Sequence, residues 1–403
     1  MKKVLAALCV IIALGAGLWY FREDLSDLAW NIGLPTLFEF SQTEPPTVQA
    51  PQDPPVPGDA EVPSEKYFFS LLNERQRQAY EEIRAQIFEF PEKIRTLKID
   101  EDDFTAVHRA LIYDNPELFF LTNTAVMEFH TFACWYKPEY SCTPEQYSGM
   151  LAALERERQA VFAAVPPGAD DYQKEKIVHD LLIASCSYGV SEHDSDIYGA
   201  LVEHRAICSG YAKAAKYLLD GLGIYNYLVS GDAVSGGSRE SHMWNTVSIG
   251  GKPYYLDVTW DDADSGSGAA GYTYFNVTQA GVALSHFPEY PPESGCIYRE
   301  QNYFVREGRW FSAWDDNARA VFENRLVETV RDGGVSFDVA FDTALLRESA
   351  VGELIEGQRI FRMLRSAAQR TETDLRTDIV NYSVVEELNV LHIDLTKNYE
   401  DAE

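Results

Sequence analysis

After a proline-rich stretch, apolar positions recur with helical spacing through residues 65–168. In residues 72–90, Ala79, Ile83 and Ile87 lie four residues apart among charged side chains, which predicts an amphipathic helix. Asn73 followed by Gln76 has the pattern of a capping box at its start.

Two further helices are predicted in this part of the chain. One runs through residues 100–115 and ends before Pro116, and the other begins near Pro144 and is broken by the "PPG" at 166–168. Residues 125–137, "AVMEFHTFACWYK", alternate and predict a strand. We therefore expect residues 65–168 to form a mainly helical region.

The pattern changes to short elements in residues 169–312. "HRAICSGYAKAAKYLLDGLGI" predicts a helix that begins at Cys208 and ends at Gly221 and Gly223. "ESHMWNTVSIGGKPYYLDVTWDD" contains two alternating runs on either side of Gly250-Gly251, a pair typical of a tight β-hairpin turn.

The last part of the chain predicts a small α/β region over residues 313–403. It contains a helix, the strand "VSFDVAF", a long helix near 348–369 and two strands, "IVNYSVVEEL" and "NVLHIDL". Residues 299–310 predict a short strand pair just before it. Taken together, the elements predict an α+β fold with a helical N-terminal part and a small α/β C-terminal appendage.

The N-terminus predicts export. Lys2 and Lys3 precede an apolar run that ends at Phe21, and residues 1–21 fit either a signal peptide or a membrane anchor. An uncleaved single-pass anchor is favoured, because no clean cleavage site follows the run, and secretion is the alternative. Residues 22–64 include a proline-rich linker, so we expect the rest of the chain outside the cytoplasm.

Composition narrows the classes of partner. The 403 residues are 46% hydrophobic and carry a net charge of −29, which permits sizeable cores and argues against binding nucleic acid. Four cysteines remain beside Cys9 and Cys208. Cys134 and Cys142 are the most plausible disulfide pair, and four buried free thiols are the alternative.

Cys208 is the first candidate for chemistry. At the start of a helix, unpaired backbone N–H groups and the helix dipole favour an anion. A thiol in such a position has a reason to ionise more easily than a free cysteine, and nearby N–H groups can stabilise an oxyanion. A buried structural thiol is the competing interpretation of the cysteine taken alone.

The predicted hairpin supplies a partner for this thiol. With a two-residue turn, Ile249 faces Lys252, and His242 and Asp257 become diagonal neighbours on one face. A carboxylate there can orient the imidazole and stabilise its charged form. A register shift of one residue would separate the two side chains.

Three other histidines were weighed as functional groups. His179 fits a residue at the edge of the core that bonds to a neighbour, and His204 lies in the approach to Cys208, where it could perturb the thiol. His193 lies in "HDSD", a weak candidate for a metal site. We expect no metal and no other cofactor.

The Cys208 block and the His242–Asp257 hairpin together resemble the transglutaminase-like superfamily of papain-type folds, in particular its bacterial exported members. The similarity covers roughly residues 171–276, with "NPELFF" and "DYQKEKIVHDLL" as further matching segments. The resemblance implies a papain-like core and assigns Cys208 as nucleophile, His242 as general base and acid, and Asp257 as the orienting acid.

Such a constellation predicts a cell-surface thiol enzyme that attacks peptide or protein amides through an acyl-enzyme. Hydrolysis by a cysteine protease or peptidase is favoured. Transglutaminase-type acyl transfer and a catalytically silent peptide- or cell-wall-binding module are the alternatives. The polar segments 232–241 and 261–272 are expected as rims of the site, which mildly favours a cationic or polar peptide. Trp244, Trp260, Tyr254 and Tyr255 are expected in the core or the groove wall.

Overall fold

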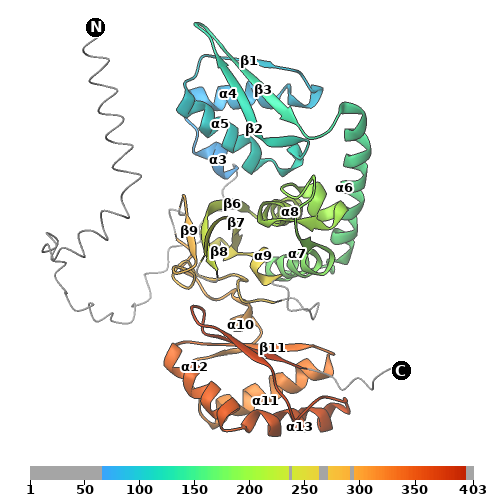
Figure 1. The fold of residues 1–403 in the computed structure, drawn as a ribbon, viewed down its shortest axis with the longest axis vertical. Helices are drawn as coiled ribbons and strands as arrows, with labels where there is room; N and C mark the ends of the chain where they lie inside the picture. The colour runs from blue at the N-terminus through green and yellow to red at the C-terminus, as the bar shows by residue number, and fades with distance from the viewer. Residues whose placement is uncertain (1–65, 236–237, 263–270, 291–294, 396–403) are drawn as a thin grey trace, which may run out of the picture. The chain divides into compact units, whose positions relative to one another are not determined.

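A computed structural model describes residues 66–235, 238–262, 271–290 and 295–395 (Figure 1). The predicted anchor, residues 1–21, and the juxtamembrane segment and linker, residues 22–64, lie outside the described residues. Among the helices that the structure describes, none is both long and apolar enough to cross a membrane. The described residues belong to one compact unit and mix helices with mainly antiparallel sheets, so the predicted α+β class is confirmed.

The N-terminal region packs helices against a small antiparallel sheet of order β1-β3-β2. Its helices are α3 (Tyr67–Ser70), α4 (Glu74–Arg84), α5 (Glu101–Asp114) and α6 (Pro144–Ala164), and its strands are β1 (Ile94–Thr96), β2 (Leu121–Phe129) and β3 (Cys134–Tyr140). The capping box of Asn73 and Gln76 is present, and α5 ends before Pro116 as expected.

The single strand expected over residues 125–137 is wrong. The chain turns back after Phe129, with the His130 N–H bonded to the Ala133 carbonyl at 3.0 Å, and its two halves pair as β2 and β3. Alternation continued through the turn residues, so the pattern alone did not reveal the reversal. The region is therefore less purely helical than predicted.

The middle of the chain folds around a four-stranded antiparallel sheet of order β8-β7-β6-β9. Its strands are β6 (Asn226–Ser235), β7 (Ser238–Ile249), β8 (Lys252–Leu256) and β9 (His286–Pro288). Helices α7 (Asp171–Ser185), α8 (Cys208–Gly221) and α9 (Val258–Asp261) accompany it, and a two-stranded parallel ribbon joins β4 (Ser187–Tyr188) to β5 (Arg205–Ala206).

Helix α8 is the central helix of this core. Its side chains Ala214, Ala215, Leu218 and Leu219 are fully buried, in a cluster that also contains Val247 and Leu256 of the sheet. The Asn245 amide of β7 donates to the Ala212 carbonyl of α8 at 3.0 Å. The nucleophile candidate and the hairpin are thereby held against each other.

The C-terminal region forms another four-stranded sheet, of order β10-β11-β13-β12. Its elements are α10 (Tyr303–Arg306), β10 (Trp310–Phe311), α11 (Asp316–Arg331), β11 (Ser336–Phe341), α12 (Ala344–Val351), α13 (Arg359–Thr371), β12 (Tyr382–Val385) and β13 (Val390–Asp394). Figure 1 shows α11, α12 and α13 gathered on one side of this sheet.

Two expectations for this part of the chain are wrong in detail. Residues 299–310 do not form a strand pair, because Asn302 caps the short helix α10 and only the last residue of that range enters a strand. The long helix expected near 348–369 is interrupted between α12 and α13, where Gln358 adopts a left-handed conformation with φ of 57°.

Candidate active site

Cys208 is the first residue of α8, as the sequence predicted. The preceding Ile207 provides no side-chain cap, and among the described residues no hydrogen bond reaches the backbone N–H of Cys208 or Ser209. Such free N–H groups at a helix start can stabilise an anion. The cysteine side chain is partly exposed, so a substrate can approach it.

Gly210, two residues after Cys208, lies where there is no room for a side chain. A Cβ atom at this position would lie 2.4 Å from the Asp194 carbonyl oxygen and 2.7 Å from the Ala206 Cβ. The first turn of α8 therefore packs directly on the loop that precedes it. The Ile207 N–H donates to the same Asp194 carbonyl at 2.9 Å, which fixes the entry to the helix.

His242 and Asp257 meet as the hairpin register predicted. The β7–β8 pairing places Ile249 opposite Lys252, with φ of 58° and 76° at Gly250 and Gly251 in the turn. His242 Nε2 donates to Asp257 Oδ2 at 2.6 Å, and both residues are buried. Asp257 lies just beyond the end of β8, where its Oδ1 accepts from the Trp260 N–H at 3.1 Å and caps α9.

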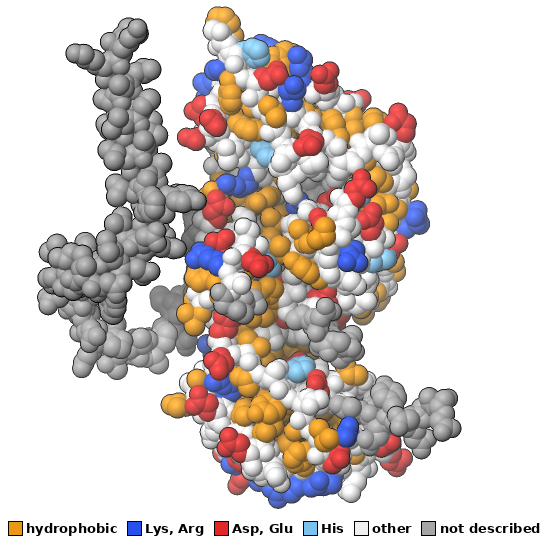
Figure 2. Space-filling model, in the orientation of Figure 1, with side chains coloured by type: hydrophobic (Ala, Val, Ile, Leu, Met, Phe, Trp, Pro, Cys, Tyr) orange, Lys and Arg blue, Asp and Glu red, His pale blue; other side chains and the backbone are white. Residues whose placement is uncertain are grey.

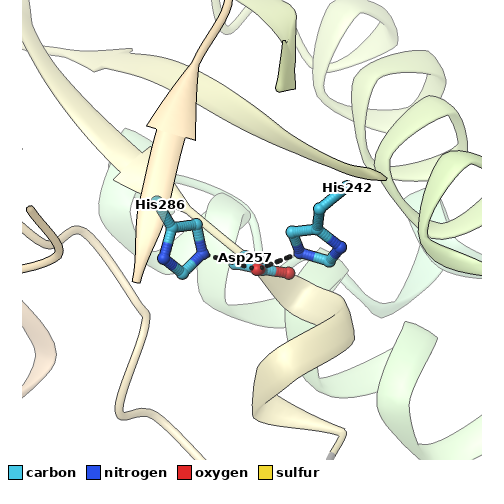
Figure 3. Close-up of side chains that lie close together, drawn as sticks. All are labelled: His242, Asp257 and His286. Atoms are coloured by element: carbon cyan, nitrogen blue, oxygen red, sulfur yellow. Dashed lines mark hydrogen bonds and ion pairs between the residues drawn. The ribbon is translucent and has the colours of Figure 1, made fainter. Parts of the chain in front are cut away.

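A second histidine, His286, completes the surroundings of the carboxylate and was missed by the sequence analysis. Its Nε2 donates to Asp257 Oδ2 at 3.0 Å (Figure 3). Its Nδ1 lies 2.8 Å from the Ser285 hydroxyl. His286 lies in β9, which pairs with β6 and not with the hairpin itself. Strand β9 has only three residues and pairs with a strand that is distant in the chain, so no local sequence signal identified His286.

His242 and Asp257 each shift the pKa of the other towards the charged form. Burial by itself lowers the pKa of His242, but the Asp257 carboxylate and the nearby Cys208 side chain outweigh burial and raise that pKa well above its ordinary value. Burial likewise opposes ionisation of Asp257, while His242 and His286 hold the pKa of its carboxyl well below the usual range. The geometry therefore favours an imidazolium beside an ionised carboxylate.

The site opens into a cavity of about 1080 Å³ that both Cys208 and His242 line. The hydrogen bond from Nε2 to Asp257 leaves Nδ1 of His242 for the thiol, and Cys208 is close enough to contribute a hydrogen bond to the shift of the His242 pKa. The exposed side chain of Tyr188 and the partly exposed side chain of Trp260 line the same cavity. Cys208 and His242 thus share the lining of the cavity, and Asp257 is bonded to His242.

The four aromatic residues weighed earlier divide between core and groove. Trp244, Tyr254 and Tyr255 are at most 1% exposed and belong to the core. Trp260 lines the cavity, with its ring 5.4 Å from that of His242. The rim expected over residues 232–241 is the end of the β6–β7 hairpin, paired up to Ser235 and Ser238, while most of the rim expected over 261–272 lies outside the described residues.

The other histidines have local partners. His179 is fully buried between Asp180 and Asp261, at 3.1 Å from each carboxylate, which agrees with a residue that bonds to its neighbours. His193 bonds to Asp196 at 2.9 Å, and the other oxygen of Asp196 accepts from the N–H groups of Tyr198 and Gly199. These contacts fix a turn.

His204 has a different role from that of a neighbour to the thiol. It adopts φ of 56°, and its carbonyl accepts from Ser187 N–H at 3.0 Å, while its side chain is exposed. The residue therefore closes the β4–β5 connection by its backbone.

In the part of the chain that the structure describes, one group of three residues has the composition of a metal site, namely His242, Asp257 and His286. The imidazole and carboxylate atoms lie within 4.8 Å of one another. Both histidines, however, lie at hydrogen-bond distance from the same Oδ2 atom of Asp257. Hydrogen bonds from their N–H groups therefore explain why the three side chains lie close together.

The disulfide weighed for Cys134 and Cys142 is absent. Cys134, Cys142, Cys186, Cys208 and Cys296 are all free thiols. Cys134 is buried, with its Sγ 3.4 Å from the Ile99 carbonyl oxygen, whereas Cys142 is partly exposed. The alternative of unpaired thiols therefore holds for these residues.

Comparisons with known proteins find limited similarity. No protein-family model and no curated protein matches the chain. Solved structures that resemble it include a TGase, with 14% identity, a TM-score of 0.25 and coverage of 41% of this chain and 50% of that one.

Two other structures are named as candidate proteases. A cysteine protease of that description from Cytophaga hutchinsonii has 16% identity and a TM-score of 0.24, over 33% of this chain and 54% of the other. One from Parabacteroides distasonis has 12% identity and a TM-score of 0.23, over 40% and 37%. The chain thus spans about half or less of each structure, and TM-scores of this size leave its chemistry to be argued from its own side chains.

Proposed function

We propose that this chain is a thiol enzyme that attacks peptide or protein amides, with Cys208 as nucleophile, His242 as general base and acid, and Asp257 as the orienting carboxylate. The observation that carries the proposal is the position of His242. Its Nε2 is bound to Asp257 at 2.6 Å, and the rest of the ring shares a cavity with a cysteine at a helix start.

The chemistry follows from that arrangement. The Cys208 thiol gives its proton to His242 Nδ1, and the sulfur attacks the amide carbonyl carbon. The free N–H groups at the start of α8 stabilise the negative oxygen of the tetrahedral intermediate. The C–N bond then breaks as His242 returns the proton to the leaving amine, which leaves a thioester on Cys208.

Water completes the favoured reaction. His242 takes a proton from a water molecule that attacks the thioester, and the products are a carboxylic acid and the regenerated thiol. An amine in place of water would give transfer and cross-linking. Of these outcomes we propose hydrolysis, since the cavity of about 1080 Å³ is open to solvent around a partly exposed thiol.

The first experiment measures the pH dependence of Cys208 alkylation, mapped by mass spectrometry. We expect rapid reaction with iodoacetamide at neutral pH, because His242 can take the proton of the thiol. His242→Ala should remove that reactivity. A wild-type thiol that reacts no faster than that of His242→Ala would overturn the proposal and favour a binding module.

A second experiment separates hydrolysis from transfer. The protein is incubated with a mixed peptide library and a labelled primary amine, and Cys208→Ala serves as the control. New carboxyl termini that depend on Cys208 support hydrolysis, and incorporation of the amine in their place identifies transfer.

The location at the cell surface is likewise a proposal, based on the apolar segment that ends at Phe21. Fractionation of cells that make the full chain, combined with protease treatment of intact cells, tests it. Recovery of the protein in the cytoplasm would contradict an exported enzyme.

A further inference from the structure

The cavity at Cys208 has a second wall, and this wall belongs to the C-terminal region. The core contributes Tyr188, Glu240 and Trp260, and the β12–β13 hairpin contributes Ser383, Glu386 and His392. The segment that the sequence analysis left without a role therefore borders the same space as the candidate nucleophile.

The two faces of the C-terminal sheet differ in what they contact. Phe337, Val339 and Leu391 point to the face that the C-terminal helices cover, and they share one apolar cluster with them. Ala340 and Val390, which are paired, belong instead to the cluster of the core. The sheet is thus held between its own helices and the core.

The face of the C-terminal sheet that contacts the core also reaches the cavity. Ser383, His392 and Asp338 are opposite one another in the register of β12, β13 and β11, two residues from the Val385, Val390 and Ala340 row. Because side chains two residues apart share a face of a sheet, the same face is apolar where it meets the core and polar where it lines the cavity. This change matches a surface built to contact a polar ligand.

The tip of the hairpin is fixed in place. Tyr274, which lines the cavity from the core, donates its hydroxyl to Glu387 Oε1 at 3.2 Å. Arg347 donates to the Glu386 carbonyl oxygen at 3.2 Å. These bonds hold the backbone of the tip while the carboxylate of Glu386 remains exposed.

Acidic residues outnumber the two histidines, His242 and His392, in the lining of the cavity, and the charge of His242 is offset by Asp257. The acidic residues that line it are Glu240, Asp261, Asp262, Glu386 and Glu387, and neither lysine nor arginine is among the lining residues that the structure describes. His392 adds no net positive charge, because it is bonded to both Asp338 and Asp394. Acidic side chains are also spread over the outer surface (Figure 2).

Not all of these carboxylates are equally available. Asp261 accepts from His179 and from the Tyr274 N–H, and Asp262 accepts from the Tyr211 hydroxyl. Within the described part of the chain, the side chains of Glu240 and Glu386 have no hydrogen-bond or ion-pair partner. Glu240 belongs to β7 of the core, and Glu386 follows β12 in the C-terminal region.

We infer that the C-terminal region completes the substrate site. In this site, Glu240, Glu386 and Glu387 select a substrate with a cationic side chain, lysine or arginine, close to the amide that Cys208 attacks. This inference rests on the proposed function, since it names the substrate class of the same site. A cleft lined by charges of one sign concentrates ligands of the opposite sign and speeds their association.

The test measures binding without turnover. The full chain carrying Cys208→Ala is titrated with labelled peptides that differ at one central position, which is lysine, arginine, glutamine or glutamate. At low ionic strength we expect the lysine and arginine peptides to bind about tenfold or more tightly than the glutamate peptide, with the difference shrinking as salt is added. Equal binding of all four peptides would overturn the inference.

A matched pair of variants locates the selectivity. Glu386→Gln/Glu387→Gln removes two charges from the hairpin, and glutamine at 387 can still accept from Tyr274. Glu356→Gln/Glu372→Gln removes two charges from exposed positions of the same C-terminal region that do not line the cavity. The first pair should reduce the preference for cationic peptides severalfold, and the second should leave it intact. Equal effects of both pairs would show that only overall charge matters.

Binding and catalysis can fail separately. A cationic preference in Cys208→Ala, combined with no thioester formation or hydrolysis by the wild type, would refute the proposed function and leave a binding cleft. Hydrolysis by the wild type without any preference would refute the selectivity alone.

Discussion

His242 donates from Nε2 to Asp257 Oδ2 at 2.6 Å, across the end of the β7–β8 hairpin. Because this bond fixes which ring nitrogen faces the carboxylate, it also leaves Nδ1 available to Cys208. Asp257 is held in turn through Oδ1, which caps α9. The Asp257 carboxylate thus orients the His242 ring with one oxygen and caps helix α9 with the other.

Asp257→Asn tests the electrostatic part of this relationship. An amide lacks the negative charge that raises the pKa of His242, so we expect kcat to fall by about 10²–10⁴-fold. Cys208 alkylation should also be slower than in the wild type at neutral pH. The profile is measured with iodoacetamide at several pH values, and circular dichroism checks that the variant is folded. An unchanged profile in a folded variant would contradict the proposed pairing.

In the proposed mechanism, His286 influences Cys208 through its bond to Asp257 and is a positioning residue. His286→Leu removes an N–H donor to Oδ2, so we expect a loss of about tenfold in kcat with little change in KM. His286→Gln, which can still donate, should recover part of this activity and keep the pH profile closer to that of the wild type. If the leucine and glutamine variants lose activity equally with the same profile, the hydrogen bond is not what matters.

Gly210→Ala should destabilise the fold at the start of α8. The new methyl group would lie 2.4 Å from the Asp194 carbonyl oxygen, so the helix or the loop must move, at a cost of about 1–3 kcal/mol in the free energy of unfolding. Gly149→Ala in α6 is the matched control.

A Cβ at Gly149 meets no atom within 4 Å. We expect this change to stabilise the protein by about 0.5–1 kcal/mol, because alanine favours the helix. Urea denaturation of both variants gives the comparison. Equal stabilities would show that the contact between α8 and the loop relaxes freely.

Glu175 gives a pH dependence of stability. It is fully buried in α7, and burial raises the pKa of its carboxyl to about 8, although the Asn276 amide donates to it at 2.6 Å. The native state therefore keeps a proton that the unfolded state releases at lower pH. The contribution of Glu175 to stability is complete below the pKa of this carboxyl in the unfolded state, and it is lost as pH rises towards and through about 8.

Glu175→Gln should remove this dependence, because the amide carries no charge and its oxygen can still accept from Asn276. We expect the variant to melt at a higher temperature than the wild type at pH 8 and to approach it at pH 5. Thermal melts at the two pH values measure the difference. A wild type whose advantage grows with pH would mean that the carboxylate is stabilised in the fold.

Local pattern predicted much of the site. The Gly250-Gly251 turn and the two-residue period of the strands placed His242 beside Asp257, because a tight turn fixes register over the few residues that follow it. The helix at Cys208 followed from the spacing of its alanine and leucine residues. These features depend on neighbours in the chain, which the sequence displays directly.

Other features depend on contacts between distant segments. The turn between β2 and β3 and the break between α12 and α13 were hidden by apolar spacing that continues through each of them. His286 reaches Asp257 only because β9 pairs with β6, a non-local pairing for which hydrophobic periodicity gives no signal.

The sequence by itself determined the positions of Cys208, His242 and Asp257 on a helix start and a hairpin, because turn chemistry and periodicity act over short separations. Only the tertiary structure decided that Asp257 has a second histidine and that the β12–β13 hairpin borders the cavity at Cys208. Packing of one sheet face against a distant core makes those contacts, and the free energy that selects this packing belongs to the whole fold.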